Sequence, residues 1–212
     1  MNGSDSNDGS YGSPWKTYLQ FVTYYQEGDK PSGHHDPVPG DVFYFFDGTY
    51  DDTYLYNGST EHFFMRNKDG TSSNKIMMKA FPGETSVVFQ ELYILQTEYW
   101  IFEGLTVTAG NNGFRLEEGD FGEIRNCHIY DTNGVENNND SGIKMTDCEN
   151  WNIHHNRIHD NYDREDLQQN NANIQTFTGT GNTFTRNVVY NASTGLSACI
   201  KAKHGTSGGD WT

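Results

Sequence analysis

The sequence predicts an all-β protein, a β-solenoid in which the short strands of successive turns stack on one another. Two apolar columns recur with the same steps of 22, 29 and 31 residues: Phe102, Ile124, Ile153, Phe184 and Val107, Ile129, Ile158, Val189. Short segments between Asn- and Gly-rich turns carry these columns without helical periodicity, which is typical of stacked repeat units. The composition agrees, because 13 Tyr, 13 Phe and 23 Gly suit many short strands joined by polar turns.

Residues 1–30 are expected to form a cap rather than a solenoid turn. In "SPWKTYLQFVTYY", Ser13 is a suitable N-cap and Pro14 suits the first helical position. Four apolar residues then fall on one helix face: Tyr18, Phe21, Val22, Tyr25. Because terminal repeats of a solenoid need a cover, we predict a short helix over its open end.

Solenoid turns are expected over residues 40–212. Turn signals at 38–41 ("VPGD"), 47–50 ("DGTY") and 81–84 ("FPGE") separate the apolar strands "VFYFF" and "KIMMKAF" of the first, irregular turns. The whole chain, 1–212, is therefore predicted to be one domain.

Each later turn adds further strands and a short corner. A second set of strands starts at Phe114, Ile143, Ile174 and Ile200. Between the two apolar columns lies a third, Leu105, Cys127, Asn156 and Asn187. Stacked Asn156 and Asn187 are expected to form an inward amide ladder, in which each side chain satisfies the next. The three cysteines lack CxxC spacing and are expected to be buried, free and apolar: Cys127, Cys148, Cys199.

Several segments together resemble a known family. "GSDSNDGSYGSPWKT", "PGDVFYFFDGTY", "IMMKAFPGE" and "IFEGLTV", in this order, resemble the start of right-handed parallel β-helix proteins of the pectate-lyase-like superfamily. The resemblance covers essentially the whole chain and implies that fold. It is weakly specific for activity, since the fold hosts polysaccharide lyases, glycoside hydrolases, epimerases, adhesins and phage tailspikes. Members usually have more turns, and no cap is recognisable after "IKAKHG", so we expect a chain truncated at its C-terminus.

Basic residues gather at one position of the second set of strands. If the first apolar residue of each strand points inward, the next points outward: Arg115, Lys144, Gln175, Lys201. Two positions further lie Glu117, Thr146, Phe177 and Lys203. Only 14 of 212 residues are Lys or Arg, so three in a row of four exceed what composition predicts. The row is either a solvated face paired with Glu117 and Asp147 or a groove for an anionic chain.

The resemblance favours the groove, since lyases of this superfamily bind acidic polysaccharides along such a strand face. β-Elimination needs a neutralised C5 carboxylate, a base for the C5 proton and an acid for the leaving oxygen. In several such families the base is Lys or Arg, which implies Lys144 and Lys201 here. Arg115 and Lys203 would clamp the carboxylate or supply the acid, and His204 would shuttle protons. The remaining expected substrate contacts are Gln175, Glu117 and Phe177.

A polar loop precedes the third strand of this set. In "NYDREDLQQNN", residues 161–171, three carboxylates stand among Asn and Gln, as in an oxygen-rich calcium site: Asp163, Glu165, Asp166. Calcium is therefore the expected cofactor, and a solvated polar loop is the competing interpretation. Tyr162 and Arg164 are expected to contact sugar.

The histidines and tryptophans give weaker indications of function than the basic row and the acidic loop. Adjacent His154 and His155 would face opposite sides of a strand, and His159 is expected to be a surface residue without a partner. Trp100 and Trp151 are expected to pack in the core or at its rim.

Two further functions remain open from the sequence. A glycoside hydrolase would use clustered carboxylates, for which Glu117, Asp147, Asp163 and Asp166 are available, although they contain no local Asp-Asp pair. A non-catalytic β-helix would only bind glycans or form part of an adhesin or tailspike. The interpretation that we carry forward is an enzyme, a lyase acting on a uronate-containing polysaccharide.

Charge and hydropathy limit the partners. The formal net charge is −15 and the pI about 4.7, which argues against nucleic acid. No apolar run approaches a membrane span, and no signal peptide precedes Met1. We expect a secreted, extracellular, bacterial protein whose signal peptide is absent from the chain, a monomer that binds an acidic polysaccharide.

Overall fold

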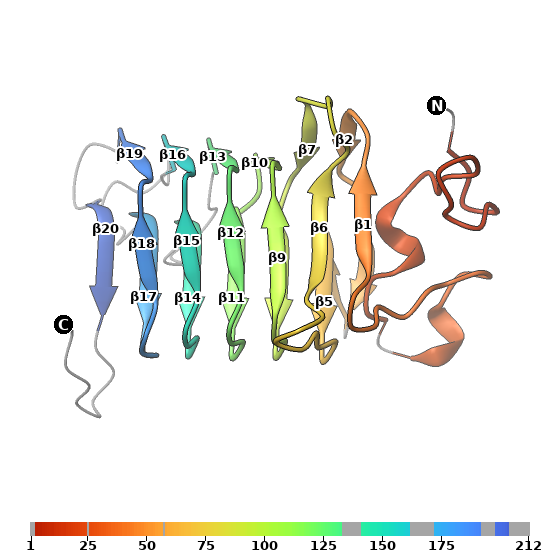
Figure 1. Cartoon of the computed structure of the whole chain (residues 1–212), viewed down its shortest axis with the longest axis horizontal. Coiled ribbons are helices and arrows are strands. Elements are labelled where there is room, and N and C mark those ends of the chain that lie inside the picture. The colour runs from red at the N-terminus through yellow and green to blue at the C-terminus, as the bar shows by residue number, and fades with distance from the viewer. Residues whose placement is uncertain are drawn as a thin grey trace.

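The computed structural model describes residues 3–24, 26–56, 58–132, 141–161, 172–191 and 198–203 of the chain. They form a parallel β-helix whose turns stack side by side along the long axis of the molecule (Figure 1). The N-terminal segment lies beside β1 at one end of the stack, and β20 lies at the other end. The predicted all-β solenoid is confirmed.

Three parallel sheets of six strands each make up the walls of the β-helix. Sheet 1 contains β5 (Phe63–Arg66), β8 (Leu92–Leu95), β11 (Phe114–Glu117), β14 (Ser141–Thr146), β17 (Ala172–Phe177) and β20 (Ala198–Lys203). Sheet 2 contains β1 (Val42–Phe45), β6 (Ile76–Ala80), β9 (Trp100–Glu103), β12 (Glu123–Arg125), β15 (Asn152–His154) and β18 (Thr183–Thr185). Sheet 3 contains β2 (Gly48–Tyr50), β7 (Val87–Phe89), β10 (Thr106–Thr108), β13 (His128–Tyr130), β16 (Arg157–His159) and β19 (Val188–Tyr190). An antiparallel pair, β3 (Tyr54–Tyr56) and β4 (Ser59–Glu61), stands apart from them.

The three corners between the sheets differ in length. From β9 onward, every connection from sheet 2 to sheet 3 has two residues, such as Asn126 and Cys127. The last three connections from sheet 1 to sheet 2 have five residues each. From β10 onward, the connections from sheet 3 to sheet 1 are 109–113, 131–140, 160–171 and 191–197. The unequal steps in the sequence therefore arise at this last corner.

The strand registers confirm the apolar columns. In sheet 2, Ile124 pairs with Phe102 and Ile153, and Ile153 pairs with Phe184. The other two predicted columns pair in the same way in sheets 3 and 1. Because side chains alternate across a strand, one register places a whole column inside.

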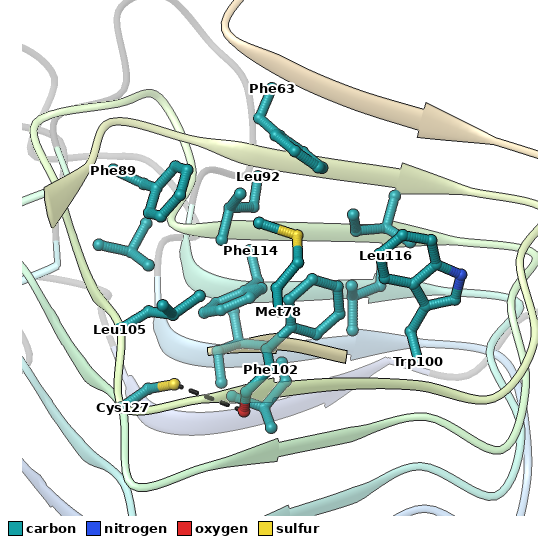
Figure 2. Packing of buried hydrophobic residues seen from close by; sticks show 14 of the residues in the cluster. Phe63, Met78, Phe89, Leu92, Trp100, Phe102, Leu105, Phe114, Leu116 and Cys127 are labelled. Atoms are coloured by element: carbon teal, nitrogen blue, oxygen red, sulfur yellow. Dashed lines mark hydrogen bonds between the residues drawn. The ribbon is translucent and has the colours of Figure 1, made fainter. Parts of the chain in front are cut away.

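The columns fill the interior turn by turn. Figure 2 shows Phe102, Phe114 and Trp100 packed with aliphatic neighbours from several turns, all of them buried. Burial of each such side chain stabilises the fold by about 1.5–3 kcal/mol. At the β20 end the pattern changes, since Val188 is 61% exposed and Ile200 is 52% exposed.

Amide side chains tie the corners of successive turns together. Asn156 Nδ2 donates to Asn187 Oδ1 at 3.1 Å and to Ile124 O at 2.9 Å, which confirms the predicted ladder. A second pair at another corner was not foreseen: Asn161 Nδ2 donates to Asn173 Oδ1 at 2.9 Å. Buried amides of this kind satisfy backbone groups that the turns leave unpaired.

The predicted capping helix is wrong. In its place are two short 3-10 helices, η1 (Tyr18–Gln20) and η2 (Glu27–Asp29), and the described part of the chain contains no α-helix. The N-cap of η1 is Thr17 rather than Ser13. Asp5 Oδ1 accepts the backbone N–H groups of Lys16 and Thr17 at 3.0 and 2.8 Å, so these donors are held in a loop.

Side chains of this N-terminal segment nevertheless cover the end of the solenoid. Tyr18, Phe21 and Val22 are buried in the same apolar cluster as the first turns. Phe21 stacks on Phe43 with ring centroids 4.0 Å apart. The cover is thus aromatic packing without a regular helix. Tyr25 lies outside the described residues.

Cysteine and tryptophan predictions had mixed outcomes. Cys127 and Cys148 are buried and free, and burial raises the pKa of each thiol to about 12. Cys199 is exposed, so its predicted burial is wrong. It lies on the last described strand, where no further turn of the described chain packs over it. Trp100 and Trp151 lie in the core as expected.

In the described ranges no helix is long and apolar enough to cross a membrane.

Candidate functional site

The row of basic residues predicted from the sequence lies on the outer face of sheet 1. Arg115 pairs with Lys144, Lys144 with Gln175, and Gln175 with Lys201 on neighbouring strands. Successive members of such a row are about 4.8 Å apart. Tyr93 precedes Arg115 in the same row and was not singled out from the sequence. We call Tyr93, Arg115, Lys144, Gln175 and Lys201 the sheet 1 row.

The N-terminal part of the sheet 1 row is internally paired. Arg115 Nε donates to Glu117 Oε1 at 2.8 Å, and the guanidinium lies 4.1 Å from the centre of the Tyr93 ring. Tyr93 OH donates to Glu117 Oε2 at 2.7 Å, and burial together with this bond raises the pKa of Tyr93. Burial also raises the pKa of the nearby Glu61 carboxyl. Arg115 and Glu117 therefore interact first with each other, as the solvated-face interpretation expected.

The middle of the row departs from the expectation. Gln175 is fully buried, and Ser141 Oγ donates to its Oε1 at 3.1 Å. Gln175 lies on the predicted outer side of β17 but is not exposed as expected, because strand alternation fixes the face of a side chain but not what packs over that face.

Two lysines of the row remain partly accessible. Lys144 is half-buried, and no carboxylate among the described residues forms an ion pair with it. Lys201 is also half-buried, and burial lowers the pKa of its ammonium group. Their register places both on one face, with the Gln175 strand between them.

The second row of sheet 1 is placed as predicted along the backbone. Glu117, Thr146, Phe177 and Lys203 follow one another in register. Asp147 accepts a hydrogen bond from Thr178 Oγ1 and does not pair with a lysine within the described ranges. The side chain of Lys203 lies outside the described residues, and so do several other predicted site residues: Tyr162, Asp163, Arg164, Glu165, Asp166, His204. Within the described ranges, no group of three or more His, Cys, Asp or Glu is arranged to hold a metal ion.

The outer face of sheet 2 carries a charged network that sequence reasoning missed. Arg125 bridges two carboxylates, with Nη2 2.7 Å from Glu103 Oε2 and Nη1 2.9 Å from Glu123 Oε1. His154 Nε2 lies 2.7 Å from the same Glu123 oxygen. Burial opposes ionisation of Glu123, but the bonds from His154 and Arg125 outweigh it and lower the pKa of the carboxyl.

Two lysines complete this network. Lys75 Nζ is 3.9 Å from Glu123 Oε2, and Lys79 Nζ is 3.9 Å from Glu103 Oε2. We call Lys75, Lys79, Glu103, Glu123, Arg125 and His154 the sheet 2 network. A sequence signal for it existed, since Glu103, Arg125 and His154 each directly follow a member of the Phe102 column.

Histidines and tyrosines gather on the outer face of sheet 3. The Nε2 atoms of His128 and His159 are 2.8 Å apart, and His159 Nδ1 is 2.5 Å from Asp160 Oδ2. His159 also stacks on Tyr190, with centroids 4.5 Å apart. Its expected lack of a partner is wrong. Burial, with His159 and Arg157 nearby, lowers the pKa of His128.

Adjacent His154 and His155 do meet, contrary to the expectation of opposite faces. Their Nδ1 atoms are 2.7 Å apart. The reason is that His155 lies at a corner with φ of 55°, where strand alternation ends.

Comparisons with known proteins agree with this architecture. The family model described as "Right handed beta helix region" matches residues 86–207. Pectate lyase Pel9A is 20% identical with a TM-score of 0.61, over 86% of this chain and 44% of that chain. A rhamnogalacturonan lyase is 18% identical with a TM-score of 0.65, over 93% of this chain and 54% of that chain. This chain thus spans about half the length of these solved chains. No curated protein matches the sequence.

Proposed function

Because the chain belongs to the right-handed beta helix family, we propose that it is a carbohydrate-active protein, a polysaccharide lyase that cleaves a uronate-containing polymer by β-elimination. The observation that carries the proposal is the pair Lys144 and Lys201 on one outer face, in a chain of net charge −15. The two similar solved structures bear the names of a pectate lyase and a rhamnogalacturonan lyase, which supports a uronate polymer as substrate.

The two lysines suit different parts of β-elimination. A base must remove the C5 proton while the C4–O bond breaks and a C4–C5 double bond forms, and the C5 carboxylate must be stabilised throughout. Burial lowers the pKa of Lys201, which favours the neutral amine that a base requires. Lys144 is suited to the substrate carboxylate, since no described carboxylate holds it. The strands that carry them are two spacings, about 9.6 Å, apart.

The described carboxylates favour a lyase over a hydrolase. A glycoside hydrolase needs two carboxyl groups available to one glycosidic bond. Glu117 is bound by Arg115 and Tyr93, and Asp147 is bound by Thr178. Two of the four carboxylates considered for hydrolysis are therefore engaged within the protein.

Further parts of the proposal concern residues beyond the described ranges. We propose that Lys203 clamps the substrate carboxylate or supplies the acid, that His204 shuttles protons, that Tyr162 and Arg164 contact sugar, and that Asp163, Glu165 and Asp166 bind calcium. Calorimetric titration with calcium, with melting curves before and after a chelator, tests the last point. If the titration gives no heat and the chelator does not change the melting temperature, the chain does not bind calcium. We also propose that the protein is exported by a bacterium.

The direct test is the ultraviolet absorbance of the unsaturated product, with alginate, pectate and glycosaminoglycans offered in turn. We expect the absorbance to rise with one of them, and Lys201→Ala to reduce kcat/KM by about 100-fold or more, since general bases contribute about 10²–10⁴-fold. Lys144→Ala is expected to raise KM. Lys79→Ala on sheet 2 is the matched control and is expected to leave the rate unchanged, because Lys79 is paired with Glu103 on another face.

Other results would contradict the proposal. Reducing ends released without absorbance would identify a hydrolase. Salt-sensitive binding of a polyuronate without any cleavage would identify a binding protein.

A further inference from the structure

One corner of the β-helix carries aromatic residues where small residues are expected. Between sheets 1 and 2, Glu98, Asp120 and Glu149 are joined by parallel bridges, so the residues after them occupy one position on successive turns: Tyr99, Phe121, Asn150. Thr180 O accepts the backbone N–H of Asn150, which places Gly181 at this position on the next turn.

This corner position requires left-handed backbone. The φ angles are 59° at Tyr99, 56° at Phe121, 58° at Asn150 and 71° at Gly181. Asn and Gly adopt this conformation at low cost, whereas bulky side chains are strained there. The chain thus uses the low-cost residues on two turns and aromatic residues on the other two. Strain of this kind is often retained where a side chain has a functional role.

The two rings form a flat, partly open surface. They stack with centroids 5.0 Å apart and an angle of 9° between their planes, and Phe121 is 40% exposed. Side-chain size then falls from Phe121 to Asn150 to Gly181 along the same corner. A hollow of about 310 Å³ lies beside the rings and is lined by Tyr99, Phe121 and Asn150 of this corner; its volume is at the lower end of the size of small-ligand sites.

Polar groups of several kinds line the same hollow. Asn150 and Asn152 are exposed, and Lys75 and Glu123 reach it from the sheet 2 network. Asn152 Oδ1 accepts from Thr183 Oγ1 at 3.0 Å, so its amide N–H groups are the part directed to a ligand. The hollow therefore offers amide and ammonium donors and a carboxylate acceptor beside an aromatic surface.

We propose that this hollow binds a neutral pyranose ring of a glycan. The apolar face of a pyranose packs on aromatic rings, and its hydroxyl groups use donors and acceptors at the rim. The charges of the site are already balanced, because Glu123 is bonded by Arg125 and His154 and paired with Lys75. A uronate would add charge beside Glu123, whereas a neutral sugar adds none. The site lies away from the sheet 1 row and does not depend on lyase activity.

The test uses Phe121→Asn in the full chain. Asn is favoured at positive φ, so we expect the variant to melt no lower than the parent protein. Calorimetry with cellohexaose, xylohexaose and mannohexaose is expected to show binding of at least one by the parent, and about tenfold weaker binding by the variant, since loss of an aromatic contact is worth about one factor of ten. Tyr11→Asn, which removes another exposed aromatic residue 63% accessible to solvent, is expected to bind like the parent.

Two results would overturn the proposal. One is that no neutral hexasaccharide binds the parent protein. The other is that Phe121→Asn binds normally but melts lower, which would make the ring stack purely structural. Lys201→Ala separates this proposal from the lyase, because it is expected to lose the absorbance rise and keep the binding of neutral sugar, so either proposal can fail alone.

Discussion

The outer faces of sheets 1 and 2 carry similar numbers of basic residues but differ in how those residues are neutralised. On sheet 2, Lys75, Lys79 and Arg125 all pair with Glu103 or Glu123. On sheet 1, Arg115 pairs with Glu117, whereas Lys144 forms no ion pair with another described residue. A row of cations therefore indicates an anion-binding face only where neighbouring carboxylates do not already neutralise it.

The same comparison assigns different tasks to the two faces. A balanced network holds its side chains in place and offers a neutral ligand fixed donors and acceptors. A row with excess positive charge attracts a polyanion, and its affinity for that polyanion falls as the salt concentration rises. We therefore place the proposed elimination on sheet 1 and the proposed neutral sugar site at the edge of sheet 2.

Removing the Glu123 carboxylate should have the largest effect of the changes considered, because it takes away the charge that neutralises the cations of sheet 2. Glu123→Gln leaves Arg125, His154 and Lys75 short of a carboxylate, so we expect unfolding free energy to fall by about 1–3 kcal/mol at neutral pH. The freed cations should also make the protein bind a polyuronate more tightly at low salt. Urea denaturation and retention on immobilised pectate measure the two effects. Glu149→Gln, at an exposed carboxylate, is the control and should change stability by less than about 0.5 kcal/mol. An equal loss in both variants would contradict the network's role.

Replacing Arg115 should lower the unfolding free energy by less, and it tests whether Arg115 has a structural role on sheet 1. Arg115→Lys keeps the charge but loses the planar contact with Tyr93 and the directed bond to Glu117, so we expect a loss of about 1 kcal/mol. Denaturation in urea measures this loss, with Arg186→Lys at an exposed corner as the control. Unchanged stability together with weaker polyuronate binding would instead make Arg115 a substrate contact.

Acid should reveal the smallest effect, on sheet 3. Burial lowers the pKa of His128, so the unfolded chain takes up a proton at this residue more readily than the folded chain. Its contribution to stability is complete above the ordinary His value of 6.5 and is lost as pH falls below it. We expect unfolding free energy, measured by urea denaturation, to decrease from pH 7 to 5, with a shallower decrease in His128→Gln. An equal slope in His128→Gln and the parent would contradict this assignment.

The sequence was sufficient for features that depend on period alone. The apolar columns, the register of the sheet 1 row and the Asn156–Asn187 ladder all follow from repeats at matched steps. Features that depend on what packs over a face were not predictable. Gln175 is on the expected side of its strand but buried. The expected capping helix does not form, because backbone N–H groups such as that of Thr17 donate to Asp5, which is distant in sequence.

The sheet 2 network shows a different limit. Its members stand beside the apolar columns that were aligned, but mixed Lys, Glu, Arg and His in a row do not resemble one another as residue types. Their complementarity becomes visible only when the row is read as charge pairs across neighbouring strands.

The unequal corners make this chain a natural framework for loop exchange. Insertions in the two-residue corners would displace the amide ladder and every strand after it, whereas the corner from sheet 3 to sheet 1 already accommodates connections as different as 109–113 and 160–171. Segments introduced there enter beside the sheet 1 row without altering the stacking of the turns. A designer can thus vary what a polymer meets on that face while the rest of the molecule stays constant.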